Sequence, residues 1–195
     1  AITVRAMEAR YHVDRKQADR VERTALLLFD QVAATWKLRQ PALRQLIAWA
    51  ARLHEVGLDI AHSHYHHHSA YLLAHSDMPG FNQNEQHFLA SLVGAHRRKF
   101  NSAEIATMAP KGWARRAKRM AMLLRLAVLF NRSRTSDFPD RLILKAQRRL
   151  MIVSLAGVWL DANPLTLADI EVEQLYLQAA GIELQLVRLG AAGEE

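Results

Sequence analysis

The chain has 195 residues, half of them hydrophobic, which suffices to bury one core or a core with a small appended lobe. It contains no cysteine, so disulfides, thiol nucleophiles and cysteine-based zinc sites are excluded. Lysine and arginine number 26 against 19 acidic residues, and the resulting formal charge of +7 favours a polyanionic partner.

The two ends of the chain and its hydropathy bear on location. No stretch approaches the roughly 18 apolar residues that a membrane span requires, and the N-terminus lacks the pattern of a signal peptide. A cytoplasmic protein is therefore expected, with peripheral attachment to a membrane as the alternative. The chain begins at Ala1 and runs directly into helical pattern, which is typical of an excised domain or a processed chain.

Helical periodicity dominates residues 1–138. Asp14, with Gln17 three residues later, resembles a capping box, and apolar residues then recur at steps of three and four. The same spacing returns after Pro41, where Gly57 is expected to end the helix in a left-handed conformation. The predicted helices cover residues 14–36, 41–57, 69–76, 82–96 and 113–132. Helices in such close succession predict an orthogonal bundle.

The pattern changes after residue 139 from helical spacing to alternation. Residues 141–147 and 150–155 are predicted as short strands, although the turn between them lacks the usual glycine or asparagine. A helix over 167–180 and a strand over 182–188 are predicted next. The expected fold class is therefore mainly α with a small α+β lobe: a helical domain over residues 1–138, and a β-β-α-β appendage over residues 139–195 packed on it.

Histidines are concentrated in one segment, with five between His62 and His68. Such a cluster suggests a metal site. His66, His67 and His68 are consecutive, however, so at most two of them can join one coordination sphere, and the cluster is equally consistent with exposed polar residues in a loop. His54 shares a helical face with apolar residues and is expected to point inward, either as a hydrogen-bonded core residue or as a ligand.

Two segments resemble a known enzyme family. Residues 53–57, LHEVG, resemble the LHDIG signature of HD-domain phosphohydrolases, with glutamate in place of aspartate. The longer string over residues 53–81, continuing to the AHRRK of residues 95–99, closely resembles the C-terminal domain of the exopolyphosphatase and guanosine pentaphosphate phosphohydrolase family. The HS of residues 62–63 and the HRRK of residues 96–99 favour the exopolyphosphatase branch. This resemblance implies that the helical domain is an HD-like bundle.

HD enzymes hold a metal ion through a histidine on an early helix, an adjacent His-Asp pair and an aspartate on a late helix. By resemblance, these positions fall on Gln17, His54, Glu55 and Val128. Valine cannot coordinate a cation, and a neutral amide is a poor ligand for a transition metal. The HD metal site is therefore expected to be degenerate, and neither catalysis nor a cofactor is expected in this chain.

The resemblance also implies a role for the chain. The parent enzyme would release orthophosphate from the end of inorganic polyphosphate in N-terminal actin-like domains that use Mg²⁺. The present chain would bind and guide the polyphosphate, contact those catalytic domains and support a homodimer. Protonation of histidines near pH 6 should then strengthen anion binding. The implied polyphosphate-binding residues are His62, His66, His68, His96, Arg97, Arg98, Arg125 and Arg134.

Two alternatives stay open. The chain is an active metal-dependent HD phosphohydrolase, on a nucleotide or another phosphoester, if the alignment slips by a turn and Asp19 or Asp30 becomes a ligand. A nucleic-acid-binding helical domain is supported by net charge alone, and it would be expected to expose aromatic rings for base stacking. The four tryptophans fall instead in helical or strand patterns that predict core positions. They are Trp36, Trp49, Trp113 and Trp159.

Overall fold

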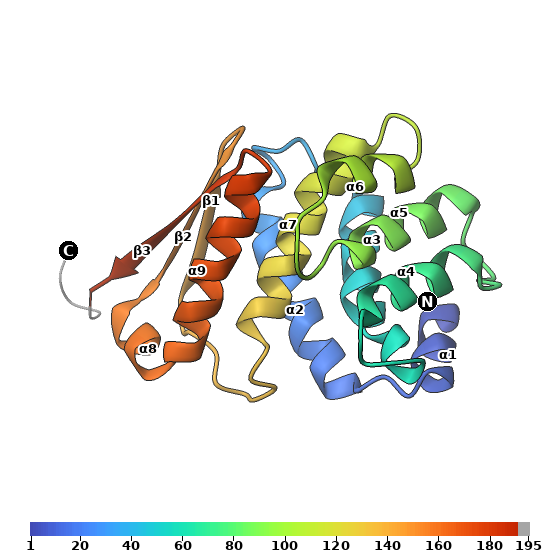
Figure 1. Cartoon of the computed structure of the whole chain (residues 1–195), viewed down its shortest axis with the longest axis horizontal. Helices are drawn as coiled ribbons and strands as arrows, with labels where there is room; N and C mark the ends of the chain where they lie inside the picture. Colours follow the sequence, from blue (N-terminus) through green and yellow to red (C-terminus); the bar gives the residue numbers. More distant parts are fainter. Residues whose placement is uncertain (191–195) are drawn as a thin grey trace.

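The computed structural model describes residues 1–190, which form a mostly helical protein with one small sheet (Figure 1). The helices are α1 (Ile2–Arg10), α2 (Arg15–Val32), α3 (Pro41–Leu53), α4 (Tyr65–His75), α5 (Gln83–Gly94), α6 (Ser102–Met108), α7 (Ala114–Phe130), α8 (Gly157–Ala162) and α9 (Pro164–Ala179), with a 3-10 turn η1 (Val56–Asp59). The strands are β1 (Leu142–Ala146), β2 (Leu150–Ala156) and β3 (Glu183–Leu189). The predicted fold class, mainly α with a small α+β lobe, is confirmed. Within the described residues, no helix has the length and apolar character needed to cross a membrane.

Helix α7 lies at the centre of the fold beside α2, with α1, α3, α4, α5 and α6 on one side and the lobe on the other (Figure 1). Every residue from Met120 to Phe130 is buried, so this half of the helix is enclosed on all sides. Helices α2, α3, α5 and α6 pack on it from the bundle, and α9 packs on it from the lobe. Two polar residues at this helix, Arg125 and Asn131, are therefore buried and need partners inside the protein.

The lobe is a three-stranded sheet in the order β1-β2-β3. Strands β1 and β2 are antiparallel, with Leu142 opposite Leu155, whereas β2 and β3 are parallel. A parallel pair requires a crossover connection, which α8 and α9 supply. The β1–β2 turn forms without a glycine, through a hydrogen bond of 2.8 Å from Gln147 N to Leu150 O. The predicted order of two strands, a helical segment and a third strand is thus observed.

One side chain of the bundle reaches directly into the lobe. Gln31 on α2 donates from Nε2 to Leu142 O at 3.0 Å and accepts from Leu144 N at 2.6 Å. These two bonds satisfy backbone groups of the edge strand β1 that would otherwise have no partner within the sheet. The predicted domain boundary near residue 138 stays a prediction, because the lobe contacts the bundle here and through α9.

The structure corrects several helix predictions. The helical pattern noted at the start of the chain corresponds to α1, whereas α6 and α8 were not predicted. The helix predicted over 14–36 ends at Val32. The helix predicted over 69–76 begins earlier, at Tyr65, so the consecutive histidines lie on a helix and not in a loop. The residue before it, His64, adopts a left-handed conformation with φ of 53°, which starts the helix there without a side-chain cap.

Gly57 is required for a different reason from the one predicted. Helix α3 ends at Leu53, before Gly57, and the backbone of Gly57 is not left-handed. A β-carbon at this position would lie 2.2 Å from Tyr65 O and 2.5 Å from Ser69 N. The η1 turn therefore packs directly on the backbone of α4, where Gly57 N donates a hydrogen bond of 2.8 Å to Ser69 Oγ.

Candidate functional site

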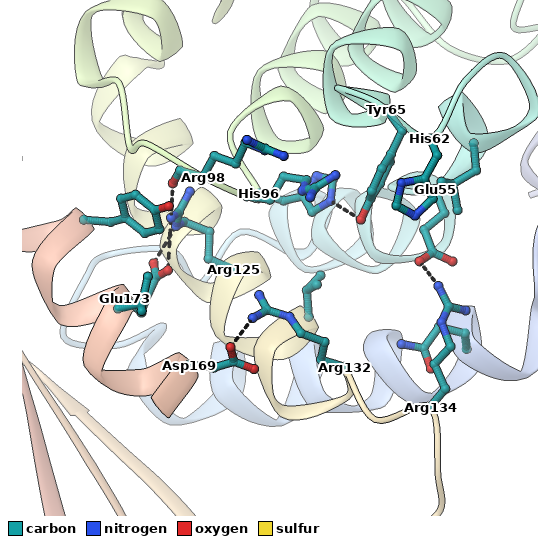
Figure 2. A pocket seen from close by; sticks show the side chains of 16 residues that line it. Glu55, His62, Tyr65, His96, Arg98, Arg125, Arg132, Arg134, Asp169 and Glu173 are labelled. Carbon is teal, nitrogen blue, oxygen red and sulfur yellow. Dashed lines mark hydrogen bonds and ion pairs between the residues drawn. The ribbon is translucent and has the colours of Figure 1, made fainter. Parts of the chain in front are cut away.

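A pocket of about 460 Å³ lies where the end of α3, the segment after α5, the end of α7 and helix α9 meet (Figure 2). Five arginines and three carboxylates line it, so positive charge is in excess. Such a surface favours an anion. The lining residues are Gln17, Glu55, Leu58, His62, Tyr65, His96, Arg97, Arg98, Arg125, Val128, Arg132, Arg134, Asp169, Val172, Glu173 and Tyr176.

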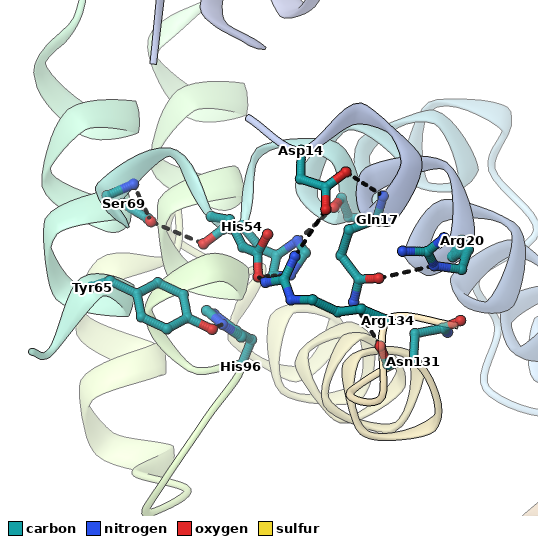
Figure 3. A network of polar contacts seen from close by, with 12 residues as sticks. Asp14, Gln17, Arg20, His54, Tyr65, Ser69, His96, Asn131 and Arg134 are labelled. Atoms are coloured by element: carbon teal, nitrogen blue, oxygen red, sulfur yellow. Dashed lines mark hydrogen bonds and ion pairs between the residues drawn. The ribbon is translucent and has the colours of Figure 1, made fainter. Parts of the chain in front are cut away.

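The positions aligned with the HD metal ligands converge on this pocket. Gln17, Glu55 and Val128 line it, although they come from three separate segments, and His54 adjoins Glu55 in the interior. The amide of Gln17 is already used, because its Nε2 donates to Asn131 O at 2.7 Å and its Oε1 accepts from Arg20 Nε at 3.0 Å (Figure 3). The residues present therefore do not fit the transition-metal ion of an HD enzyme.

The alternative carboxylates do not restore that metal site. Asp19 pairs with Arg52 at 2.7 Å, and Asp30 accepts from Nε and Nη2 of Arg44, both at 2.8 Å. Neither aspartate lines the pocket. The active-hydrolase alternative thus gains no ligand from either residue.

The negative charge at the degenerate HD positions is paired with an arginine. Arg134 donates from Nη2 to Glu55 and from Nη1 to Asp14 Oδ2, the latter at 3.2 Å (Figure 3). Asp14 also accepts from Gln17 N at 3.1 Å, and this backbone hydrogen bond is the main cause of its lowered pKa. The capping box predicted at Asp14 is half formed, since the side chain of Gln17 turns into the interior instead.

Two buried histidines, His96 in the pocket wall and His54 behind it, have rings nearly perpendicular and 5.1 Å apart. His54 Nδ1 donates to Ala51 O at 2.6 Å, and His96 Nδ1 donates to Val93 O at 2.5 Å. Tyr65 OH lies 3.3 Å from His96 Nε2 and donates to it. His54 is therefore an inward-pointing, hydrogen-bonded core residue, one of the two roles that its position predicted.

The buried histidines predict loss of stability in acid. Burial lowers the pKa of His54 and lowers the pKa of His96 well below the ordinary value of 6.5. Because the unfolded chain then binds protons more readily than the folded one, we expect the free energy of unfolding to fall below about pH 6.5, by up to about 1.4 kcal/mol per pH unit for each histidine. Urea denaturation at pH 7.5, 6.0 and 5.0 measures this, and a flat profile would contradict it.

The same pKa directions limit the predicted effect of pH on anion binding. His96 stays uncharged near pH 6, and desolvation lowers the pKa of His66 to about 3, with the neighbouring His67 and Arg97 adding to the shift. Neither ring can therefore supply the gain in anion binding that was expected from histidine protonation near pH 6.

Six of the eight predicted binding residues lie around the pocket. They are His62, His96, Arg97, Arg98, Arg125 and Arg134. His66 lines a neighbouring pocket, which shares Arg98 with the first. His68, half-buried on α4, lines neither. The structure thus brings together residues that are up to 72 positions apart, from His62 to Arg134.

The arginines of the pocket differ in how many of their N–H groups already donate to other residues. The guanidinium of Arg97 lies 4.6 Å above the ring of Tyr65, and its buried Nη1 has no partner among the described residues. Arg98 is exposed at the pocket rim. Arg125, by contrast, directs four N–H groups at Glu173 and at two backbone carbonyls. Arg97 and Arg98 are therefore the cations most available to a ligand.

A family model described as "Ppx/GppA phosphatase, domain III" matches residues 1–174. The chain belongs to the Ppx/GppA phosphatase family. The Vibrio cholerae protein named guanosine-5'-triphosphate,3'-diphosphate pyrophosphatase is 35% identical over 175 residues, which cover 89% of this chain and 34% of the relative. Proteins of the same name from Vibrio campbellii and Aliivibrio fischeri are 33% and 32% identical and cover 96% and 88% of this chain. The chain spans about a third of the length of the curated relatives it matches.

The prediction of the C-terminal domain of the Ppx/GppA family is confirmed. Two motifs, HS at residues 62–63 and HRRK at residues 96–99, favoured its exopolyphosphatase branch, whereas these three relatives are named for a guanosine nucleotide. Polyphosphate as the ligand stays a prediction.

Sequence reasoning missed the contribution of α9 to this Ppx/GppA domain. Asp169, Glu173 and Tyr176 line the pocket from that helix, and Asp169 pairs with Arg132 at 2.7 Å. Their spacing of four and three residues puts them on one face of α9, but no local pattern indicates what that face contacts. Arg132 did carry a signal, because it lies two residues before Arg134 in the segment that follows α7.

Proposed function

We propose that this chain is a phosphate-chain-binding domain of a Ppx/GppA phosphatase, and that alone it binds condensed phosphate without hydrolysing it. The observation that carries the proposal is the pocket of five arginines, in which Arg97 keeps a buried donor without a partner. A phosphate oxygen is the acceptor that such a donor favours, because a guanidinium forms charge-assisted and bidentate hydrogen bonds to phosphate.

Three features support binding without catalysis. The HD positions carry Gln17 and Val128, and Glu55 is neutralised by Arg134. A hydrolase of the HD class needs a metal ion to activate water, and these residues do not fit one. Hydrolysis would take place in the N-terminal catalytic domains of the parent enzyme, with Mg²⁺.

The ligand that we propose is inorganic polyphosphate. A chain of phosphates can contact Arg98 on one side of the pocket and Arg132 and Arg134 on the other, which a single orthophosphate cannot (Figure 2). Guanosine pentaphosphate shares the condensed phosphate groups and is the second candidate, because the relatives carry the name of that nucleotide's pyrophosphatase. Direct competition between the two ligands tests the choice.

Homodimerisation and contact with the catalytic domains are part of the same proposal. Several large apolar side chains of the lobe are exposed, and burial against another surface would stabilise the assembly. They are Val158, Leu165, Val172, Leu175 and Val187. Sedimentation of the chain at several concentrations tests self-association.

The double variant Arg97→Gln/Arg98→Gln tests the proposed ligand contacts. We expect its dissociation constant for long polyphosphate to rise at least about tenfold, because each charge-assisted hydrogen bond contributes about 1.5–3 kcal/mol. Isothermal titration at fixed salt measures it. The control Arg5→Gln/Arg115→Gln removes the same charge from exposed positions outside the pocket. An equal loss in both variants would contradict a defined site and favour nonspecific electrostatic binding.

A further inference from the structure

Three histidines outside the arginine-lined pocket lie close together at the start of α4. One ligand nitrogen from each of His64, His66 and His67 lies within 4.8 Å of the others. The rings of His66 and His67 are 4.0 Å apart between centroids, and the ring of His64 lies 6.2 and 6.0 Å from them. The three line a second pocket of about 230 Å³.

His66 provides a second observation that points to a ligand. Its side chain is only 3% exposed, and its Nδ1 makes no hydrogen bond to any described residue. Buried polar atoms in folded proteins are normally paired, so we expect this nitrogen to have a partner such as a bound ligand. His64 and His67 are exposed beside it, which leaves a path by which an ion can enter.

The backbone explains why these three histidines converge. His64 holds a left-handed conformation, with φ of 53° and ψ of 30°, which is uncommon for a residue other than glycine. This bend at the N-cap returns the ring of His64 toward the first turn, where His66 and His67 lie. His68 does not join the cluster, in keeping with the expectation that at most two of three consecutive histidines share one coordination sphere.

We propose that His64, His66 and His67 form a binding site for one divalent transition-metal ion that favours imidazole, such as Zn²⁺, Ni²⁺ or Cu²⁺. Imidazole nitrogens bound tetrahedrally to zinc at about 2.1 Å lie about 3.4 Å from one another, so small side-chain rotations complete the site. Water fills the remaining coordination position. The site is separate from the degenerate HD positions and does not depend on the proposed binding of phosphate.

The charges of the second pocket shape its selectivity. Arg98 and Lys99 line it and oppose a cation, whereas Glu104 lines it and favours one. All three are exposed, so solvent screens their effect. A site of three neutral nitrogens with no carboxylate among its ligands discriminates against Mg²⁺ and Ca²⁺, which prefer oxygen.

Metal titration of untagged, chelator-stripped protein tests the proposal. We expect one Zn²⁺ per chain, measured by competition with a chromophoric chelator, and no competition by Mg²⁺. The variants His64→Asn, His66→Gln and His67→Asn should each weaken Zn²⁺ binding at least tenfold. His68→Asn is the matched control, since it removes a neighbouring histidine of the same helix, and should change the affinity less than twofold.

The site would be refuted if His64→Asn and His67→Asn bound Zn²⁺ like the unaltered chain, or if His68→Asn weakened binding as much as they did. The first two side chains are exposed, so these variants remain informative even where His66→Gln unfolds. The absorption spectrum of bound Co²⁺ gives a second measure, because tetrahedral nitrogen coordination has a distinct band. The Arg97/Arg98 variant should lose polyphosphate binding but bind Zn²⁺ at least as tightly as the unaltered chain, because Arg98 opposes a cation in the second pocket. This outcome separates the present proposal from the preceding one.

Discussion

Replacing Arg125 with methionine is expected to lower the free energy of unfolding by about 3–5 kcal/mol, the loss typical of removing one partner from a buried ion pair. Arg125 is 2% exposed and donates to both carboxylate oxygens of Glu173, at 2.5 and 3.0 Å. It also donates to Ala95 O and Arg98 O, both at 2.6 Å. The variant leaves a buried carboxylate and two carbonyls without these donors, and urea denaturation measures the cost.

Two further variants identify the cause of that loss. The double variant Arg125→Met/Glu173→Met should recover part of the stability, because it removes the stranded charge as well. Arg44→Met is the matched control, since the pair of Arg44 with Asp30 is about half exposed on both sides. Exposed pairs contribute about 1 kcal/mol or less. A loss no larger for Arg125→Met than for Arg44→Met would contradict the structural role of the buried pair.

Substituting alanine for Gly57 is expected to destabilise the chain by about 3 kcal/mol, at the upper end of the usual cost of overpacking. The new β-carbon would lie 2.2 Å from Tyr65 O and 2.5 Å from Ser69 N, and neither backbone atom can turn away as a flexible side chain would. The η1 turn and α4 must then separate. Since Tyr65 begins α4 and His62 lies in the segment between the two elements, we also expect weaker polyphosphate binding.

Gly157→Ala is the control for this substitution. Gly157 begins α8, and the nearest atom to its added β-carbon lies 3.6 Å away, an ordinary contact. Alanine is favoured over glycine in a helix by up to about 1 kcal/mol, so this variant should be neutral or slightly more stable. Equal thermal denaturation midpoints for the two variants would show that the contact between a β-carbon at position 57 and the backbone of α4 does not destabilise the chain.

The bundle and the family could be predicted from the sequence because both signals are local. Apolar spacing marks α2, α3, α5 and α7, and the string over residues 53–81 is contiguous. The degenerate ligands could also be named, since Gln17 and Val128 fall in short recognisable patterns that the structure brings to one pocket.

The partners of the pocket residues could not be predicted, because they depend on how α9 packs on α7. Arg125 was predicted to bind polyphosphate, whereas its observed contacts to Glu173 and to the segment after α5 suit a positioning residue. The start of the histidine-bearing helix α4 could not be predicted for a different reason. A single left-handed residue, His64, determines where α4 begins. The spacing of apolar residues along the sequence does not indicate such a bend.

The most direct test of phosphate-chain binding is a titration of the unaltered chain with polyphosphates of increasing length, with orthophosphate and single-stranded DNA compared at matched phosphate concentration. We expect affinity to rise with chain length, to fall steeply with salt and to exceed that for DNA, with no orthophosphate released. Equal affinity for orthophosphate and long polyphosphate, or release of orthophosphate by the isolated chain, would contradict the account.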